Sequence, residues 1–213
     1  MRSGAELAAF LRRRGIGSDR VLAAIAAVPR ELFVPGELLQ DAYDDRALPI
    51  GHGQTISQPF MVATICAALE LSPDARVLDV GTGSGYQAAV LAELADEVVT
   101  IERVPELAAR ARQTLERAGY GDVEVRVGDG TLGVPERAPF DGIAVAAAAP
   151  AVPDSLYDQL AVGGRIAVPV GSLRDQWLEV VARRSDGPEA VRSVPCRFVP
   201  LVGAAGFEAP EAG

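Results

Sequence analysis

The sequence contains no lysine and no asparagine, and its 213 residues include one histidine and two cysteines. The lack of lysine excludes Schiff-base chemistry and any mechanism that uses a lysine base. Cys66 and Cys196 lie far apart in apolar surroundings, a spacing typical neither of a disulfide framework nor of a zinc site. We therefore expect both cysteines to be reduced and buried, and we expect no metal ion to be bound.

Basic residues are also scarce relative to acidic ones. All 20 are arginine, against 29 acidic residues, and the net charge is −9. Such a chain is poorly suited to neutralising phosphates, so we expect no nucleic-acid partner. The short basic run at residues 12–14 is typical of the solvated face of a helix.

Long hydrophobic runs are missing as well. No stretch approaches the roughly 18 apolar residues of a membrane span, and the N-terminus lacks the apolar core of a signal peptide. The sequence also shows no long heptad pattern and no isolated apolar face. We therefore expect a soluble, cytoplasmic, monomeric protein with no membrane partner.

The hydrophobic content of 49% is ample for a buried core, and we predict one domain over residues 1–213. Within it we expect N-terminal helices and a substrate loop (1–58), a core of alternating strands and helices (59–203) and a flexible tail (204–213). The alternation predicts a doubly wound, Rossmann-like α/β sheet that ends in an antiparallel hairpin turning at Asp186-Gly187. In such folds ligands bind beyond the carboxyl ends of the strands.

The elements of this sheet can be placed from apolar runs and from helix start and stop signals. We expect helices near residues 5–14, 20–28, 59–71, 86–95, 105–117 and 154–160. We expect strands near 75–80, 97–102, 123–127, within 141–148, and near 165–171, 177–184 and 191–202. Residues 43–53 show no helical period and are expected to form an ordered loop.

A glycine-rich turn, DVGTGSGY, occupies residues 79–86 between an expected strand and an expected helix. Its spacing G-x-G-x-G differs from the dinucleotide fingerprint G-x-G-x-x-G, because Tyr86 takes the place of the third glycine and would crowd a pyrophosphate. Asp79 places a negative charge near the same point. That charge suits a cationic or amino-bearing ligand better than a diphosphate.

Two further acids follow the next two strands. Glu102 can accept hydrogen bonds from both ribose hydroxyls, and Asp129, between two glycines, can accept one from an adenine amino group. Together with Asp79 they fit S-adenosylmethionine, which carries an amino acid, a ribose and an adenine. We predict this cofactor rather than NAD. The remaining alternative is a tight strand–helix turn with no ligand.

The segment GHGQTISQPF, residues 51–60, holds the hydroxyls of Thr55 and Ser57 and the one histidine, His52. Methyl transfer to a neutral acceptor usually needs a base, whereas an ionised carboxylate needs only positioning and removal from water. Hydroxyls can hold a carboxylate in place through hydrogen bonds. Spacing alone slightly favours another interpretation, in which Ser57 caps the helix that begins near Pro59 and Thr55 is a turn residue.

Several segments occur here in the order found in protein-L-isoaspartate (D-aspartate) O-methyltransferases, and the chain resembles that family over roughly residues 28–203. These segments are VPRELFVP, AYDDRALPIGHGQTISQPFMVA, VLDVGTGSGYQAAVLAEL, TIERVPELAARAR, VGDG, APFD and RFVPLVG. The resemblance implies methylation of the free α-carboxylate of L-isoaspartyl residues in damaged proteins and peptides, and it leaves open whether D-aspartyl residues are acceptors too. The ester would then close to a succinimide that hydrolyses partly to normal aspartate.

The resemblance also assigns residues. Ser57 takes the place of the family's active-site serine. The expected cofactor contacts are Thr55, Ile56, Ser57, Asp79, Gly81, Gly83, Ser84, Glu102, Arg103, Asp129 and Gly130. The expected substrate contacts are His52, Thr55, Ser57, Arg197, Phe198 and Val199.

Two details bear on this assignment. Ala146 stands at a variable place of the fourth strand, where relatives can carry a threonine or glycine. Arg46 and Arg197 could each offer positive charge to a carboxylate substrate, although a surface or loop ion pair is an equal alternative.

Three other functions stay open at this point. The first is an enzyme dedicated to esterifying an aspartate in one peptide, and the short tail argues against the extra recognition domain that such an enzyme can carry. The second is a small-molecule methyltransferase, for which His52 is the only histidine that could act as a base. The third is a protein that binds the cofactor without transferring methyl. We also expect Asp186, in an exposed Asp-Gly turn, to isomerise slowly and to become a substrate of the enzyme itself.

Overall fold

The computed structural model describes the backbone of residues 1–208 and the side chains of residues 1–190 and 194–208. Its centre is one seven-stranded sheet in the order β5-β4-β3-β6-β7-β8-β9. The strands from β5 to β7 run parallel, and β8 and β9 continue the sheet in antiparallel fashion. The strands are β3 (Arg76–Val80), β4 (Glu97–Glu102), β5 (Glu124–Val127), β6 (Phe140–Val145), β7 (Leu160–Gly171), β8 (Gln176–Arg184) and β9 (Gly187–Cys196).

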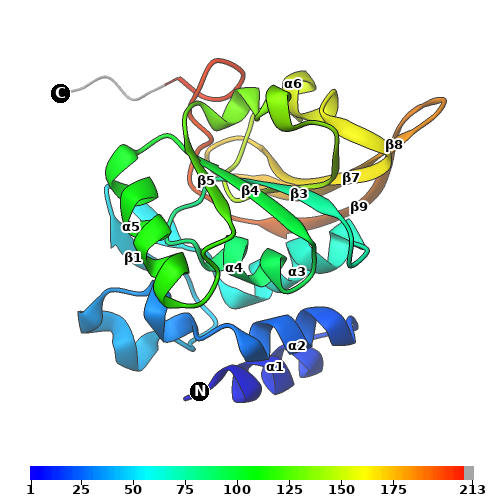
Figure 1. Cartoon of the computed structure of the whole chain (residues 1–213). Helices are drawn as coiled ribbons and strands as arrows, with labels where there is room; N and C mark the ends of the chain where they lie inside the picture. The colour runs from blue at the N-terminus through cyan, green and yellow to red at the C-terminus, as the bar shows by residue number, and fades with distance from the viewer. Residues whose placement is uncertain (209–213) are drawn as a thin grey trace.

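Helices cover both faces of this sheet (Figure 1). Beneath it lie α3 and α4, and α1 and α2 form a further layer outside them, while α6 lies above the sheet. The helices are α1 (Gly4–Arg13), α2 (Asp19–Ala27), α3 (Pro59–Leu69), α4 (Tyr86–Ala92), α5 (Pro105–Arg117) and α6 (Asp154–Tyr157), with short 3-10 turns η1 (Arg30–Phe33), η2 (Gly36–Asp41), η3 (Gly130–Leu132) and η4 (Pro135–Arg137). The doubly wound sheet with its terminal hairpin and N-terminal helices confirms the predicted fold class.

Alternation along each strand divides the apolar residues between two cores. Val77 on β3 and Ala144 on β6 face the helices α1 to α5, whereas Leu78 and Ile143, their neighbours in sequence, face the core beside α6. Strands buried on both faces are nearly continuous apolar runs, which is why β3 and β6 are recognisable in the sequence.

Hydroxyl caps define the starts of the first two helices. Ser3 accepts a hydrogen bond from the backbone N–H of Glu6, and Ser18 accepts one from that of Val21. Each bond satisfies an N–H group that has no partner within the helix. Among residues 1–208, no helix is both long enough and apolar enough to cross a bilayer.

Several local predictions differ from the structure. β7 begins at Leu160 and not at residue 165, and β9 spans Gly187–Cys196 and not residues 191–202. Within residues 43–53, expected to be a loop, the chain begins a two-stranded hairpin of β1 (Leu48–Gly51) and β2 (Gln54–Ile56), whose tip holds His52 at φ 53°. The register shifts between Pro49 and Gly51, which is why no alternating pattern marks it in the sequence. Residues 204–207 of the expected flexible tail are held by hydrogen bonds from their backbone N–H groups to residues 129, 131, 203 and 201. Residues 209–213 of that tail lie outside the described chain.

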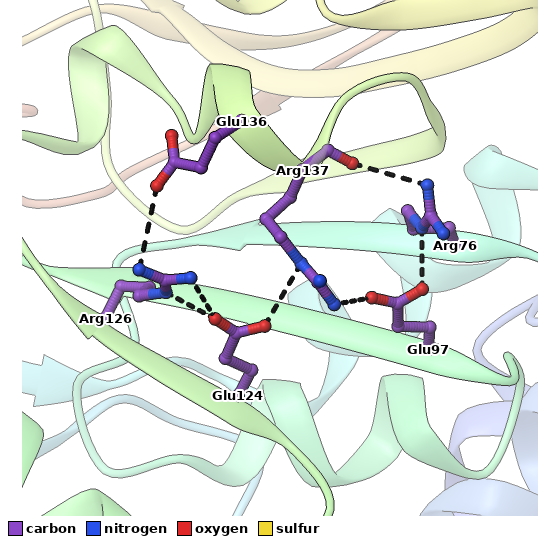
Figure 2. A network of polar contacts seen from close by, with 6 residues as sticks. All are labelled: Arg76, Glu97, Glu124, Arg126, Glu136 and Arg137. Atoms are coloured by element: carbon purple, nitrogen blue, oxygen red, sulfur yellow. Dashed lines mark hydrogen bonds and ion pairs between the residues drawn. The ribbon is translucent and has the colours of Figure 1, made fainter.

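The amino ends of β4 and β5 carry a network of ion pairs (Figure 2). Arg137 lies between Glu97 and Glu124 and pairs with both carboxylates. Arg76 Nε approaches Glu97 Oε2 at 2.6 Å, and Arg126 joins Glu124 to Glu136. This network ties η4 to the strand ends that lie farthest from the ligand site of such folds.

Candidate active site

The glycine turn after β3 adopts a backbone that other residues rarely adopt. Gly81, Gly83 and Gly85 have φ values of 94°, 53° and 91°. The N–H of Gly81 donates to the carbonyl of Ile101 at 2.9 Å, and the N–H of Gly83 donates to Glu102 Oε2 at 2.9 Å. Positive φ favours glycine, so the sequence of the turn is required by its shape. The turn is thereby fixed against the end of β4.

Glu102 ends β4 with a carboxylate that is only 6% exposed. Its Oε1 accepts from the N–H of Val104 at 3.0 Å, while Oε2 is bound by Gly83. Each carboxylate oxygen can accept a second hydrogen bond. Glu102 is therefore held rigidly and can still receive a pair of ligand hydroxyls.

A hollow that we call the turn cavity opens beside this carboxylate, at the carboxyl ends of β3, β4 and β6. It contains about 770 Å³ of empty space, part of it open to solvent. The predicted site residues that line it are Thr55, Ile56, Ser57, Gly81, Gly83, Ser84, Glu102, Arg103, Gly130 and Val199. The sequence thus brings the acceptor loop, the glycine turn and the acid of β4 to one cavity.

Asp79 differs from the expectation because it does not reach the wall of the turn cavity. Its side chain is fully buried and accepts hydrogen bonds from Gln87 Nε2 and Thr100 Oγ1, each at 2.8 Å. Burial raises the pKa of Asp79 to about 6, although the hydrogen bonds from Gln87 and Thr100 oppose that shift. Thr100 in turn lies 2.7 Å from Thr82 Oγ1, and Thr82 lines the cavity. Asp79 thus lies behind the cavity wall. It binds Gln87, which lines the cavity, and Thr100, which contacts the lining residue Thr82.

Asp129 also lies outside the cavity lining. Its Oδ1 accepts from the N–H and hydroxyl of Thr131 at 2.9 and 2.7 Å, and its Oδ2 accepts from the N–H of Ala204 at 2.8 Å. Partial burial raises the pKa of Asp129, but the hydrogen bonds from Thr131 and Ala204 and the charge of Arg103 outweigh it and leave that pKa below its ordinary value. A Cβ on Gly203 would lie 2.0 Å from Asp129 Oδ1, so glycine is required there. Asp129 therefore binds the backbone of the segment that follows β9. Its neighbour in sequence, Gly130, does line the cavity.

An orphaned buried atom tests whether the turn cavity fits the expected cofactor. Gln87 Oε1 is buried on a residue that lines the cavity, and it has no hydrogen-bond partner among the described residues. A buried acceptor without a partner is costly. An amino group of a ligand would satisfy it, and the dipoles of the glycine turn and the Glu102 carboxylate supply the other polar contacts. The residues present therefore fit S-adenosylmethionine.

A second hollow, the edge hollow, lies beside the end of β9 and contains about 1140 Å³ of empty space. Arg197 and Phe198, both predicted substrate contacts, line it. It shares four lining residues with the turn cavity, namely Thr55, Ser57, Ala146 and Val199. The two hollows therefore meet at the acceptor loop.

Ser57 does not cap α3. The N-cap residue is Gln58, and neither Gln58 nor Ser57 provides a side-chain cap. Instead the Asp45 carboxylate accepts from the N–H of Phe60, and its other oxygen accepts from Gln58 Nε2 at 3.0 Å. The capping interpretation of Ser57 is thus wrong, and the hydroxyl has no hydrogen-bond partner among the described residues. It remains available where the two hollows meet.

The charged candidates around the acceptor loop separate into two groups. Arg197 lines the edge hollow, whereas Arg46 lies outside it and pairs with Asp41 at 2.9 Å and Asp44 at 3.5 Å. His52 is exposed at the tip of the β1–β2 hairpin and lines neither hollow. The structure thus places Arg197, and not Arg46 or His52, where a carboxylate substrate could meet it.

Sequence reasoning missed several residues that line the hollows, among them Arg14, Thr82 and Gln87. Arg14, expected on a solvated helix face, lines the edge hollow, pairs with Asp45 and lies 4.1 Å over the Phe60 ring. Thr82 and Gln87 line the turn cavity. Thr82 lies within the glycine turn and Gln87 directly follows it, so their position in the sequence indicated a place near the ligand. Nothing near Arg14 in the sequence indicates that it lines the edge hollow. Cys196, expected to be buried, is only partly so and lines the edge hollow.

The fold and the paired hollows define an S-adenosylmethionine-dependent methyltransferase. Comparison with known proteins narrows this class. The chain belongs to the protein-L-isoaspartate (D-aspartate) O-methyltransferase family, whose family model matches residues 2–206.

Relatives are similar over almost the whole chain. A Methanoculleus marisnigri protein-L-isoaspartate O-methyltransferase is 52% identical over 93% of this chain and 90% of its own. One from Gloeobacter violaceus is 56% identical over 90% and 94%.

Solved structures agree with this family. A protein-L-isoaspartate O-methyltransferase superposes with a TM-score of 0.86 at 30% identity, covering 95% of this chain and 67% of that one. A Plasmodium falciparum β-aspartate methyltransferase in complex with S-adenosyl-L-homocysteine gives a TM-score of 0.80 at 25% identity, covering 93% and 98%.

Proposed function

We propose that the protein transfers a methyl group from S-adenosylmethionine to the free α-carboxylate of isoaspartyl residues, and that Ser57 and Thr55 position that carboxylate. The observation that carries this proposal is the wall shared by the two hollows, where both hydroxyl residues lie. One hollow suits the cofactor and the other opens toward solvent beside β9. A peptide that enters the edge hollow therefore meets the cofactor at Ser57.

In the turn cavity, the chain's own groups hold the cofactor. Glu102 would accept the ribose hydroxyls, Gln87 Oε1 would accept an amino group, and the buried charge of Asp79 would favour a cationic ligand. When bound, S-adenosylmethionine supplies an activated methyl group on a sulfonium sulfur.

In the edge hollow, the acceptor is an anion that needs no base. A carboxylate is already ionised at neutral pH, so Ser57 has only to donate a hydrogen bond to one carboxylate oxygen and leave the other free to react. Arg197 adds positive charge to the same hollow, and none of the described residues that line it carries a carboxylate. His52 lies outside both hollows, which supports a carboxylate acceptor over a neutral small molecule that would need a base.

The proposed product is a methyl ester that closes spontaneously to a succinimide, whose hydrolysis returns part of the residue to normal aspartate. The substrates are then damaged proteins and peptides of varied sequence rather than one dedicated peptide. The openness of the edge hollow toward solvent is in keeping with acceptors of varied sequence.

A pair of matched peptides tests the proposal. Each carries the same sequence, one with isoaspartate and one with ordinary aspartate, and both are incubated with methyl-labelled S-adenosylmethionine. We expect base-labile label on the first peptide and none on the second. Label on neither peptide would contradict the proposal, and label on both would favour an aspartyl methyltransferase.

Two further points belong to the same proposal. We place the enzyme in the cytoplasm, in keeping with two free thiols, and we propose that it acts as a monomer, because its sequence shows no long heptad pattern and no isolated apolar face. Fractionation of the host cell and light scattering of the purified protein test these two points. An extracellular enzyme or a stable dimer would contradict them.

A further inference from the structure

Arg30 is the largest side chain with no exposed surface among the described residues. It lies in η1, in a part of the chain that contributes no lining residue to either hollow. No carboxylate among the described residues lies within ion-pair distance of it, and its Nη1 has no hydrogen-bond partner there. A buried, unpaired guanidinium is expensive, so its contacts require an explanation.

Those contacts join three segments of the chain. Nε donates to the carbonyl of Ala42 at 2.8 Å, and Nη2 donates to the carbonyl of Ser57 at 2.9 Å. The guanidinium carbon lies 4.5 Å from the centre of the Tyr86 ring. Tyr86 is fully buried, begins α4 directly after the glycine turn and lines the turn cavity. Arg30 therefore contacts the main chain of the acceptor loop and the base of the cofactor turn at once.

We propose that Arg30 is a positioning residue for methyl transfer, which sets the acceptor loop at Ser57 relative to the cofactor turn at Tyr86. This inference rests on the proposed function, in which Ser57 holds the acceptor carboxylate. In-line transfer requires the reacting atoms to lie roughly 3–3.5 Å apart, and a displacement of about 1 Å can cost on the order of 100-fold in rate. The planar fork of arginine can bind two carbonyls and lie flat on a ring, whereas a lysine ammonium offers one point charge.

A purely structural role is the competing explanation, and a second arginine that binds two backbone carbonyls serves as a control for it. Arg20, in α2, also donates to two backbone carbonyls, from Nη1 to Leu71 at 2.5 Å and from Nη2 to Leu94 at 2.8 Å. Neither carbonyl belongs to a residue that lines either hollow. Arg30 and Arg20 thus each bind two backbone carbonyls, but Arg20 is exposed while Arg30 is fully buried, and only Arg30 touches the site.

The experiment compares Arg30→Lys with Arg20→Lys in the full chain. We measure kcat and KM for an isoaspartyl peptide, the Kd of S-adenosylhomocysteine and the thermal midpoint, with activity assayed well below the lower midpoint. For Arg30→Lys we expect kcat to fall about 10- to 100-fold while the Kd of S-adenosylhomocysteine changes less than about threefold. For Arg20→Lys we expect a lower midpoint and kcat within about twofold of the wild type.

Equal kcat in Arg30→Lys and Arg20→Lys would overturn the inference and leave Arg30 a structural residue. An inactive wild-type enzyme would instead refute the proposed function, so the two failures are distinguishable. If Arg30→Lys does not fold, the Nε–H resonances of the two arginines in the wild type decide. Adding isoaspartyl peptide and S-adenosylhomocysteine should shift that of Arg30 and leave that of Arg20 in place, and an unshifted Arg30 resonance would refute the inference.

Discussion

The Asp45 carboxylate accepts a hydrogen bond from the backbone N–H of Phe60 at 2.9 Å and so caps α3 from 15 residues upstream. Asp45 is nearly buried and also binds Gln58 and Arg14. The cap that Ser57 could have supplied is therefore provided by another residue. The start of α3 is therefore stabilised by Asp45, and the hydroxyl of Ser57 is not needed for that purpose.

Substitution of each residue tests this directly. Ser57→Ala removes a hydroxyl without a protein partner, so we expect stability within about 0.5 kcal/mol of the wild type and kcat reduced at least about tenfold. Asp45→Ala removes the cap and should cost about 1–2 kcal/mol of unfolding free energy. Urea unfolding and initial rates on an isoaspartyl peptide measure both. A stable and fully active Ser57→Ala would remove Ser57 from the mechanism.

Asp79 predicts a pH dependence of stability. Burial raises its pKa from 3.8 to about 6 in the folded protein. The folded state therefore holds the proton more tightly, and the resulting stabilisation is complete below pH 4 and is lost as the pH rises to about 6. Asp79→Asn cannot titrate, and its amide can still accept from Gln87 and donate to Thr100.

The difference in unfolding free energy between wild type and Asp79→Asn should therefore change by on the order of 2–3 kcal/mol between about pH 4 and pH 6. The wild type should lose stability relative to the variant as the pH rises. Denaturant titrations across that range supply the measurement. If the unfolding free energies of the wild type and of Asp79→Asn change in parallel with pH, the pKa of Asp79 is not raised in the folded protein.

Gln87 should contribute to cofactor affinity. Gln87→Leu removes the orphaned Oε1 acceptor of a residue that lines the turn cavity, and we expect the Kd of S-adenosylhomocysteine to rise about tenfold, as for loss of a hydrogen bond to a charged group. Gln87→Leu also removes one donor from Asp79. Thr100→Val removes the other donor at a residue that does not line the cavity, although it also takes the partner of Thr82, and it serves as the control. If calorimetric titrations give the same rise in the Kd of S-adenosylhomocysteine for both variants, the weaker binding comes from the missing donor to Asp79 and not from the missing Oε1.

The β8–β9 turn predicts self-methylation. Asp186 is exposed and precedes Gly187, at φ 133°, in a hairpin turn where a succinimide can form. In contrast, the carboxylate of Asp129 is held by Thr131 and Ala204. Aged enzyme given labelled cofactor should incorporate methyl at Asp186, and Asp186→Glu should not. Peptide mapping that finds aged protein without isoaspartate at Asp186 would contradict the prediction.

The sequence predicts the local parts of this molecule well. β3, β4 and α5 agree with their patterns to within a residue, because strands buried on both faces and a helix with proline at its start carry strong local signals. The glycine turn and Glu102 are likewise recognisable, since positive φ limits the residues that fit. What the sequence could not predict depends on contacts between distant segments.

Asp79 and Asp129 illustrate that limit. Both are acids beside a glycine turn or strand end, where a ligand contact is the natural expectation. Their actual partners, Thr100 for Asp79 and Ala204 for Asp129, lie 21 and 75 residues away. The same holds for Arg14, which reaches the edge hollow only because α1 packs near the start of α3. Long-range packing thus decides which polar residues face the ligand.

The ion-pair network of Figure 2 has a further consequence for the whole protein. Its partners, among them Arg137 and Glu97, belong to β-strand starts and η4, and none of them lines either hollow. Raised ionic strength screens partly exposed pairs, so salt should loosen the far end of the sheet without breaking a contact between residues that line the hollows. Adaptation of this enzyme to heat or salinity could therefore proceed through that end alone, without altering which damaged proteins it repairs.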